Sequence, residues 1–264
     1  MKRKLSAAVF FAAVTVLAFA ASAGAVDGTI EINQAKVQAA AGFPYKITSS
    51  GSYRLTGNLT VPASTDGIDV TAANVTIDLN GFLITGPGST ESIPIGINAS
   101  GKSDVTVENG TVTGFGTGAQ VGPSGIVKNV HADANGFGIN GGNNTLIEGC
   151  TANNSTQPSG VAIFCAAGCV ISGNTANGNP NIGIGSGNGS VISGNVAFHN
   201  TTGTGIYCQG TGCLITGNTA FNNGVGITGT DATMGYGGNV LDQTNNVSFG
   251  TNLGHNLCSG TICP

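Results

Sequence analysis

A short hydrophobic pattern recurs through the second half of the chain. Two apolar residues are followed by a polar residue, a glycine and, three positions after the glycine, an alanine. The copies are Leu146–Ala152, Val170–Ala176, Val191–Ala197 and Leu214–Ala220, and they begin 24, 21 and 23 residues apart. A glycine followed by Ile or Val keeps a similar interval at Gly138, Gly160, Gly183, Gly205 and Gly226. Such an interval is typical of a solenoid.

Each copy has the composition of short β-strands joined by corners. The strand runs contain Ile, Val and Thr, the corners are rich in Asn and Gly, and no copy has the helical pattern that a βαβ crossover requires. Stacked coils pair each strand with its equivalents about 4.8 Å above and below, and the Ile and Val columns fill the interior. The sequence therefore predicts an all-β fold, a single parallel β-helix.

The segment from Glu31 to Ala41 has a different pattern. It is the only helical run expected in the mature chain, and it ends at Gly42 with Pro44 just beyond. Because an open first coil exposes strand edges, a short helix at this place predicts a cap. We expect the cap segment at residues 26–46 and the β-helix at residues 47–264.

Asparagines recur at the corners that follow the strands. An Asn tolerates left-handed backbone and can hydrogen-bond to an equivalent Asn on the next coil. The pattern therefore predicts an asparagine ladder with a structural role, which Cys150 interrupts. Its expected members are Asn80, Asn109, Asn129, Asn174, Asn195 and Asn218.

Two further segments, Ile47–Leu55 and Asn74–Phe82, together with the Ile-Ser-Gly-Asn repeats, resemble secreted bacterial right-handed β-helix proteins of the pectin-lyase-like superfamily. The resemblance implies a right-handed coil over nearly the whole mature chain. It selects no activity, since that superfamily contains lyases, hydrolases, epimerases and adhesins. Its lyases commonly use an Arg in the catalytic groove, whereas Arg54 is the only Arg expected in the mature chain. The polygalacturonase motifs Asn-Thr-Asp, Asp-Asp and Gly-His-Gly do not occur in this sequence.

The N-terminus has the layout of a secretory signal peptide. Three cationic residues precede the apolar run Leu5–Ala20, and Ala23-Gly24-Ala25 offers a cleavage site, so we expect a signal peptide at residues 1–25. No later stretch approaches the length of a transmembrane helix. These features predict a protein without a membrane span after processing, either secreted or located in the periplasm or at the cell surface.

The charge of the expected mature chain disfavours nucleic acid as a partner. Without the three leader cations, 8 − 3 = 5 basic residues face 12 acidic ones, a formal charge of −7. No Lys or Arg follows Lys128, so the C-terminal half has no cationic side chain for a phosphate, sulfate or uronate.

Seven cysteines in an exported chain predict three disulfides and one free thiol. Two cysteine pairs flank equivalent corners, while the coil between them has Ser186 and Ser190 at the same places. This joint replacement predicts that each corner pair bonds internally, and a third pair repeats the spacing near the C-terminus. The expected disulfides are Cys165–Cys169, Cys208–Cys213 and Cys258–Cys263, with Cys150 buried and free. Zinc is disfavoured because no His lies in these loops.

A column of charged residues is the candidate for catalysis. The repeat places Glu108, Lys128 and Glu148 on successive coils, with Asp78 one coil earlier, all pointing outward. Calcium held by Asp78, Glu108 and Glu148, with Lys128 as a base, could serve a polysaccharide lyase or epimerase acting on a uronate polymer. A ladder of surface ion pairs explains the same residues, and we favour that interpretation because a charged column alone is weak evidence for catalysis.

Phe198 and Phe221 occupy equivalent positions on consecutive coils. If they face outward, they form a two-ring strip suited to a polymer; we expect the inward orientation that is usual for large apolar side chains. The most favoured function is noncatalytic binding of an extracellular glycan or surface partner. The alternative is the calcium-dependent lyase or epimerase, and no other cofactor is expected.

Overall fold

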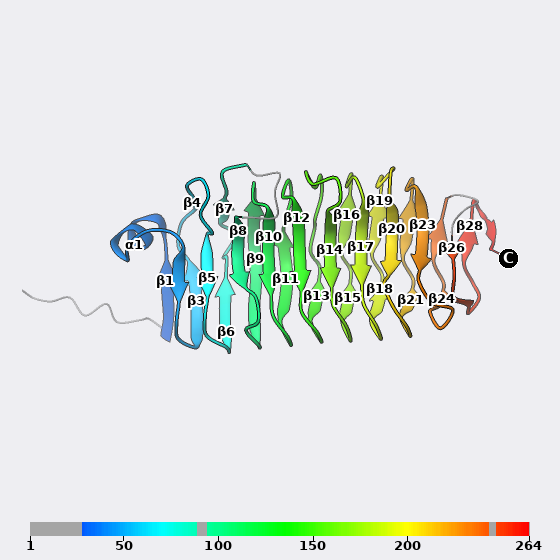
Figure 1. Ribbon diagram of the computed structural model, residues 1–264, viewed down its shortest axis with the longest axis horizontal. Coiled ribbons are helices and arrows are strands. Elements are labelled where there is room, and N and C mark those ends of the chain that lie inside the picture. Colours follow the sequence, from blue (N-terminus) through cyan, green and yellow to red (C-terminus); the bar gives the residue numbers. More distant parts are fainter. Residues whose placement is uncertain (1–27, 89–93, 243–246, 264) are drawn as a thin grey trace, which may run out of the picture.

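The computed structural model describes residues 28–88, 94–242 and 247–263. These residues form one elongated stack of coils, with α1 (Gln34–Ala39) toward one end and the C-terminal strands at the other (Figure 1). The predicted signal peptide, residues 1–25, lies outside the described residues. Among the residues described, no helix is long and apolar enough to cross a membrane.

Three sheets run along the stack. The 13-stranded sheet contains β1 (Thr29–Ile32), β3 (Gly51–Leu55), β4 (Leu59–Thr60), β6 (Val75–Asp78), β7 (Leu83–Thr85), β9 (Val105–Thr113), β11 (Ile126–His131), β13 (Leu146–Glu148), β15 (Val170–Ser172), β18 (Val191–Ser193), β21 (Leu214–Thr216), β24 (Gly235–Gly237) and β27 (Thr251–Asn252). The 10-stranded sheet contains β2 (Tyr45–Ile47), β5 (Ile68–Val70), β8 (Ile95–Ala99), β10 (Thr117–Val121), β12 (Phe137–Gly141), β14 (Val161–Cys165), β17 (Ile182–Ser186), β20 (Thr204–Cys208), β23 (Val225–Gly229) and β26 (Val247–Ser248). The 6-stranded sheet contains β16 (Thr175–Asn177), β19 (Val196–Phe198), β22 (Thr219–Phe221), β25 (Val240–Leu241), β28 (Leu257–Cys258) and β29 (Thr261–Ile262).

The strand register confirms the predicted repeat. Ile147 of β13 pairs with Ile171 of β15, which pairs with Ile192 of β18 and then Ile215 of β21. Every pairing between named strands is parallel except the closing pair of β28 and β29. The all-β parallel solenoid predicted from the sequence is therefore confirmed.

The glycine followed by Ile or Val, which recurs from coil to coil in the sequence, is displaced at one coil. Ile139 pairs with Ile163, so Ala162 and not Gly160 is the equivalent of Gly138. These inward positions need small residues because the next coil lies against them: a Cβ on Gly138 would come within 2.4 Å of the Ala162 carbonyl oxygen. The large side chains of the core come from the neighbouring Ile column, where Ile139, Ile163 and Ile184 are fully buried.

The N-terminal helix is shorter than predicted. It runs from Gln34 to Ala39, because Glu31 belongs to β1, which pairs with β3 in the 13-stranded sheet. The Asn33 side chain caps the helix by accepting a hydrogen bond from the backbone N–H of Lys36. Val37 is fully buried, so the helix packs its apolar side against the first coils.

The asparagine ladder is confirmed for Asn174, Asn195 and Asn218, but the prediction was wrong for Asn80, Asn109 and Asn129. Asn109 and Asn129 lie one position earlier on their coils, with exposed side chains and φ of 60° and 51°, where later coils have glycine. Asn80 also has a positive φ, and its amide donates to the Leu55 carbonyl. The buried ladder contains Asn174, Asn195, Asn218, Asn239 and Asn256.

Each ladder amide links three coils. Asn195 Nδ2 donates to the Ile171 carbonyl and to Asn218 Oδ1, at 2.9 and 3.0 Å. A second buried ladder, absent from the sequence-based prediction, joins Asn179, Asn200 and Asn223 at the opposite end of the short strands of the 6-stranded sheet. Both ladders satisfy buried corner groups, which would otherwise be costly.

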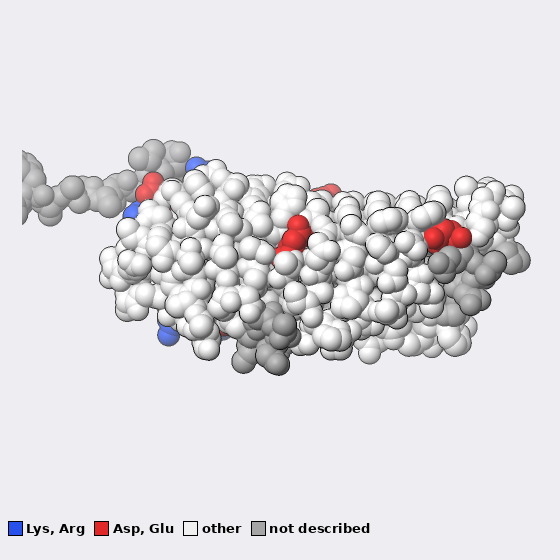
Figure 2. All heavy atoms as spheres, turned by 90° about the horizontal axis from the view of Figure 1, so that it is seen from above, with Lys and Arg blue, Asp and Glu red and all other residues white. Residues whose placement is uncertain are grey.

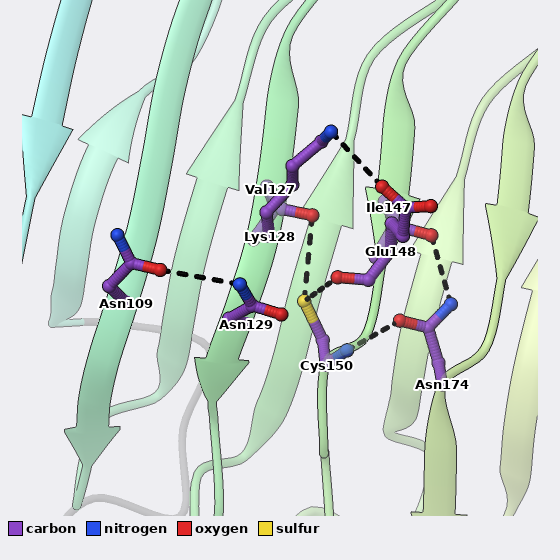
Figure 3. A network of polar contacts seen from close by, with 8 residues as sticks. All are labelled: Asn109, Val127, Lys128, Asn129, Ile147, Glu148, Cys150 and Asn174. Carbon is purple, nitrogen blue, oxygen red and sulfur yellow. Dashed lines mark hydrogen bonds and ion pairs between the residues drawn. The ribbon is translucent and has the colours of Figure 1, made fainter.

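Cys150 stands at the N-terminal end of the first ladder and does not interrupt it. Its backbone N–H donates to Asn174 Oδ1 at 2.8 Å, and its thiol donates to the carbonyls of Val127 and Glu148 (Figure 3). Burial raises the pKa of the Cys150 thiol to about 11. The other six cysteines form the disulfides Cys165–Cys169, Cys208–Cys213 and Cys258–Cys263, the pairs derived from the repeat.

Candidate functional site

The charged residues form one column on the outer face of the 13-stranded sheet. Asp78 pairs in register with Glu108, Glu108 with Lys128, and Lys128 with Glu148. Arg54 precedes Asp78 in the same column, and Ser172 follows Glu148. The alignment that the repeat predicted is therefore present in the structure.

Ion pairs occupy most of this column. Arg54 Nε lies 3.2 Å from Asp78 Oδ2. Lys128 Nζ lies 3.0 Å from Glu148 Oε2, and Figure 3 shows this second pair. Asp78 Oδ1 also accepts hydrogen bonds from the Asn80 backbone and the Asn109 amide. The Lys128 and Glu148 side chains are 38% and 50% exposed, so their pairing stabilises the fold by at most about 1 kcal/mol.

The calcium prediction rests on Asp78, Glu108 and Glu148. Within the part of the chain that the structure describes, no group of three His, Cys, Asp or Glu side chains could hold a metal ion. Lys128 lies in register between Glu108 and Glu148 and pairs with Glu148. The carboxylates are thus neighbours of a cation on the column, and calcium binding here stays a prediction.

Phe198 and Phe221 face outward, so the expected inward orientation was wrong. Their side chains are 37% and 47% exposed on β19 and β22, because the alanines that precede them, Ala197 and Ala220, face the core. The rings stack at 5.9 Å between centroids with an interplanar angle of 14°. Stacking covers one side of each ring, which leaves the other side and the edges accessible.

Polar residues continue the phenylalanine column in both directions. Asn177, on the preceding coil, pairs with Phe198. On the coil after Phe221, the carboxylate of Asp242 accepts a hydrogen bond from the backbone N–H of Asn222. The His199 ring lies 5.7 Å from the Phe198 ring. This strip therefore combines apolar contact with hydrogen-bonding groups, although exposed Val196 and Val240 make its surroundings more apolar.

The outer face of the 10-stranded sheet carries a second, longer stripe. Register places one residue from each of nine consecutive coils in a single column. We call this column the amide–aromatic stripe; its members are Lys46, Asp69, Asn98, Gln120, Asn140, Phe164, Gly185, Tyr207 and Thr228.

A small hollow lies in the middle of this stripe. Phe137, Asn140, Val161 and Phe164 line a pocket of about 190 Å³, and their side chains are half-buried. Neither Gln120 nor Asn140 hydrogen-bonds through its side chain to any described residue, so both amides are available to a ligand. Phe164 leans over the next coil, where Gly185 leaves room for its ring: a Cβ there would lie 3.2 Å from Phe164 Cδ2.

The fold agrees with one known family. The family model for the right-handed beta helix region matches residues 95–253, more than half of the chain. The chain belongs to the right-handed β-helix family. This membership confirms the fold expected from the sequence.

Two solved structures are similar to this β-helix protein. The Dettilon tailspike protein is 14% identical, with a TM-score of 0.51 over 82% of this chain and 51% of that chain. The Agl-KA catalytic domain is 13% identical, with a TM-score of 0.44 over 81% of this chain and 50% of that chain. The β-helix protein therefore spans about half the length of either structure. No curated protein sequence matches it.

The sequence-based search for sites in this β-helix missed the amide–aromatic stripe. The sequence does indicate this stripe, because the residue that follows each inward Ile of the recurring Gly-Ile pair must face outward. Reading those positions gives Asn140, Phe164, Gly185 and Tyr207. Phe164 is harder to find in this way, because the coil that contains it has Ala162-Ile163 in place of the Gly-Ile pair.

Charged residues are sparse in this chain, at 8% of the sequence. The face drawn in Figure 2 carries few charged side chains, and its Lys and Arg atoms lie toward the end that holds α1. The outer surface of the described residues includes the ion-paired column, the Phe198–Phe221 strip and the amide–aromatic stripe.

Proposed function

We propose that this right-handed β-helix protein is a noncatalytic module that binds an extracellular glycan on the amide–aromatic stripe. The observation that carries the proposal is the pocket in which the free amide of Asn140 lies beside Phe137 and Phe164. An amide both donates and accepts hydrogen bonds, as a sugar hydroxyl does, and an aromatic side chain offers apolar surface to the C–H groups of a sugar. Few convergent polar groups in a largely apolar hollow are the usual makeup of a ligand site.

An extracellular location agrees with the covalent chemistry. Three disulfides within one chain persist in oxidising compartments. We propose that the protein is exported, by the signal peptide expected at residues 1–25, to the periplasm, cell surface or medium. Glycans of a cell envelope or matrix are abundant ligands in those places.

The Phe198–Phe221 strip is the second candidate for the same function. Its rings are more exposed than those of the stripe, but stacking leaves each ring only one open side. Its apolar neighbours also favour contact with a protein surface. We therefore assign the glycan to the amide–aromatic stripe and keep the strip as a comparison site.

Affinity electrophoresis against a panel of soluble neutral and acidic polysaccharides tests the proposal. Asn140→Ala and Phe164→Ala should each weaken binding at least about 10-fold, the loss expected of a central contact. Phe198→Ala with Phe221→Ala is the matched control on another face and should change affinity less than about twofold. The assignment is wrong if the control pair abolishes binding while the stripe variants bind as the wild type.

The same panel tests the lyase or epimerase alternative. A lyase releases an unsaturated uronate product, which absorbs ultraviolet light, and an epimerase changes the polymer without cleavage. Arg54 and Lys128, the two cations of the charged column, already pair with Asp78 and Glu148. Product formation that requires Lys128, with or without calcium, would replace the noncatalytic proposal by the enzymatic one.

A further inference from the structure

We infer that the ligand of the amide–aromatic stripe is an uncharged polysaccharide that lies extended along the axis of the β-helix. This inference rests on the proposed function and adds the substrate class and its direction. Two features carry it: the distribution of charge on the outer face of the 10-stranded sheet, and the regular repetition of amide and aromatic side chains along it.

Charge is confined to the N-terminal end of the stripe. Lys46 and Asp69 are its first two members, and every later member from Asn98 to Thr228 is uncharged. The neighbouring column on the same strands is also uncharged, and Thr117 is its buried member: Ile95, Thr117, Phe137, Val161, Ile182, Thr204 and Val225.

The residues beside this face add carboxylates and little positive charge. The Asp66 carboxylate accepts hydrogen bonds from the Asn98 amide and from the Ile95 N–H. The Asp133 carboxylate, in the corner between β11 and β12, accepts one from the backbone N–H of Asn153. Lys102 lies in the turn after β8, and no Lys or Arg follows Lys128 in the sequence. Lys46 and Lys102 both lie toward the N-terminal end of this face, so an acidic polymer along the stripe from Asn140 to Thr228 would meet no compensating cation, which disfavours it.

Hydrogen-bonding and apolar groups repeat at the coil spacing. Asn98, Gln120 and Asn140 give three consecutive amides, and Phe164 and Tyr207 follow on either side of Gly185. From Asn98 to Tyr207 there are five coil steps, about 24 Å at about 4.8 Å for each step. Only an extended chain along the axis can contact all of these residues at once, and no single sugar can.

Binding of neutral and uronate polymers of equal length tests the inference on the full chain. We expect the wild type to prefer the neutral polymer by at least tenfold, with an affinity that changes less than twofold between low and physiological salt. Affinity for neutral oligosaccharides should rise with length until they span the five coil steps. A preference for uronate, or a steep loss of affinity with salt, would overturn the inference and leave the glycan-binding proposal in place.

A charge insertion supplies an independent test. The double variant Gln120→Lys with Asn140→Lys should lose neutral binding and gain uronate binding several-fold. Ser172→Lys with Ser193→Lys adds the same charge to the 13-stranded sheet, and this control should gain no uronate binding from the stripe. Equal gains in both double variants would mean that net charge alone determines binding, which refutes the inference. If no polymer of either class binds the wild type, the proposed function itself fails.

Discussion

The buried asparagine ladder makes the strongest prediction about stability, and Asn195 is the residue to change. Its side chain makes four hydrogen bonds: Nδ2 donates to Ile171 O and Asn218 Oδ1, and Oδ1 accepts from the N–H and the Nδ2 of Asn174. Asn195→Ala removes all four in a site with 1% exposure. Water cannot replace them unless the corner opens.

The cost follows from the groups left behind. A buried polar group without a partner costs about 1–3 kcal/mol. The Asn174 N–H loses its ladder acceptor, while the Ile171 carbonyl and the Asn218 side-chain oxygen each lose a donor. We therefore expect Asn195→Ala to lower the free energy of unfolding by about 3 kcal/mol, which is a Tm lower by roughly 6–12 °C for a chain of this size.

Asn129→Gly is the matched control. Asn129 has φ of 51° and an exposed side chain with one amide hydrogen bond to Asn109, and the next coil has Gly149 at this place with φ of 64°. We expect a change within about 0.5 kcal/mol. Thermal unfolding followed by far-ultraviolet circular dichroism compares the two variants, since the chain has no Trp. Similar shifts for both would refute the distinction between the buried ladder and the exposed corner asparagines.

Two further predictions concern the cysteines. Replacing Cys208 and Cys213 by Ser opens a loop of six residues, so we expect a loss of at most about 2 kcal/mol by chain entropy, read from thermal unfolding; loss of the folded state would contradict this. Cys150 should resist a chromogenic thiol reagent in the native protein and react once the chain is unfolded, because it is buried and its pKa is raised to about 11. Since folding favours the protonated thiol, its contribution to stability is complete below the ordinary pKa of about 8.5 and is lost as pH rises toward the folded value. Cys150→Ala should flatten that part of the stability profile, and an unchanged profile would show that the thiol does not titrate there.

The residues that face the core could be predicted from the sequence. The column through Ile147, Ile171 and Ile192 repeats because each coil must fill the same cross-section, and that repetition gave the strands, their register and the disulfide pairs. The predicted ladder was right for Asn174, Asn195 and Asn218 but wrong for Asn109 and Asn129, because two adjacent corner positions both accept Asn. One needs left-handed backbone, as at Asn129, and the other needs a buried amide, as at Asn174.

Outward positions are harder to interpret because stacking does not restrict their chemistry. Hydrophobicity alone placed Phe198 inside, yet the alanine column through Ala176, Ala197 and Ala220 already assigned the core side of these strands. Alternation then requires the flanking residues to face out. In a β-helix, the register of the small inward residues therefore predicts the orientation of a side chain better than the hydrophobicity of that side chain does.

The same reasoning identifies where a function can reside. A coil contributes only two outward positions per strand of the 10-stranded sheet, so a ligand site must be assembled across coils and not within one. Neighbouring outward residues would then share no sequence motif, which is why Asn140, Phe164 and Tyr207 escaped a motif search although they align in space. A polymer is the natural ligand for such a site, since its own repeat carries matching groups from one coil to the next. A compact ligand would contact two or three coils and leave the remaining members of the stripe unused.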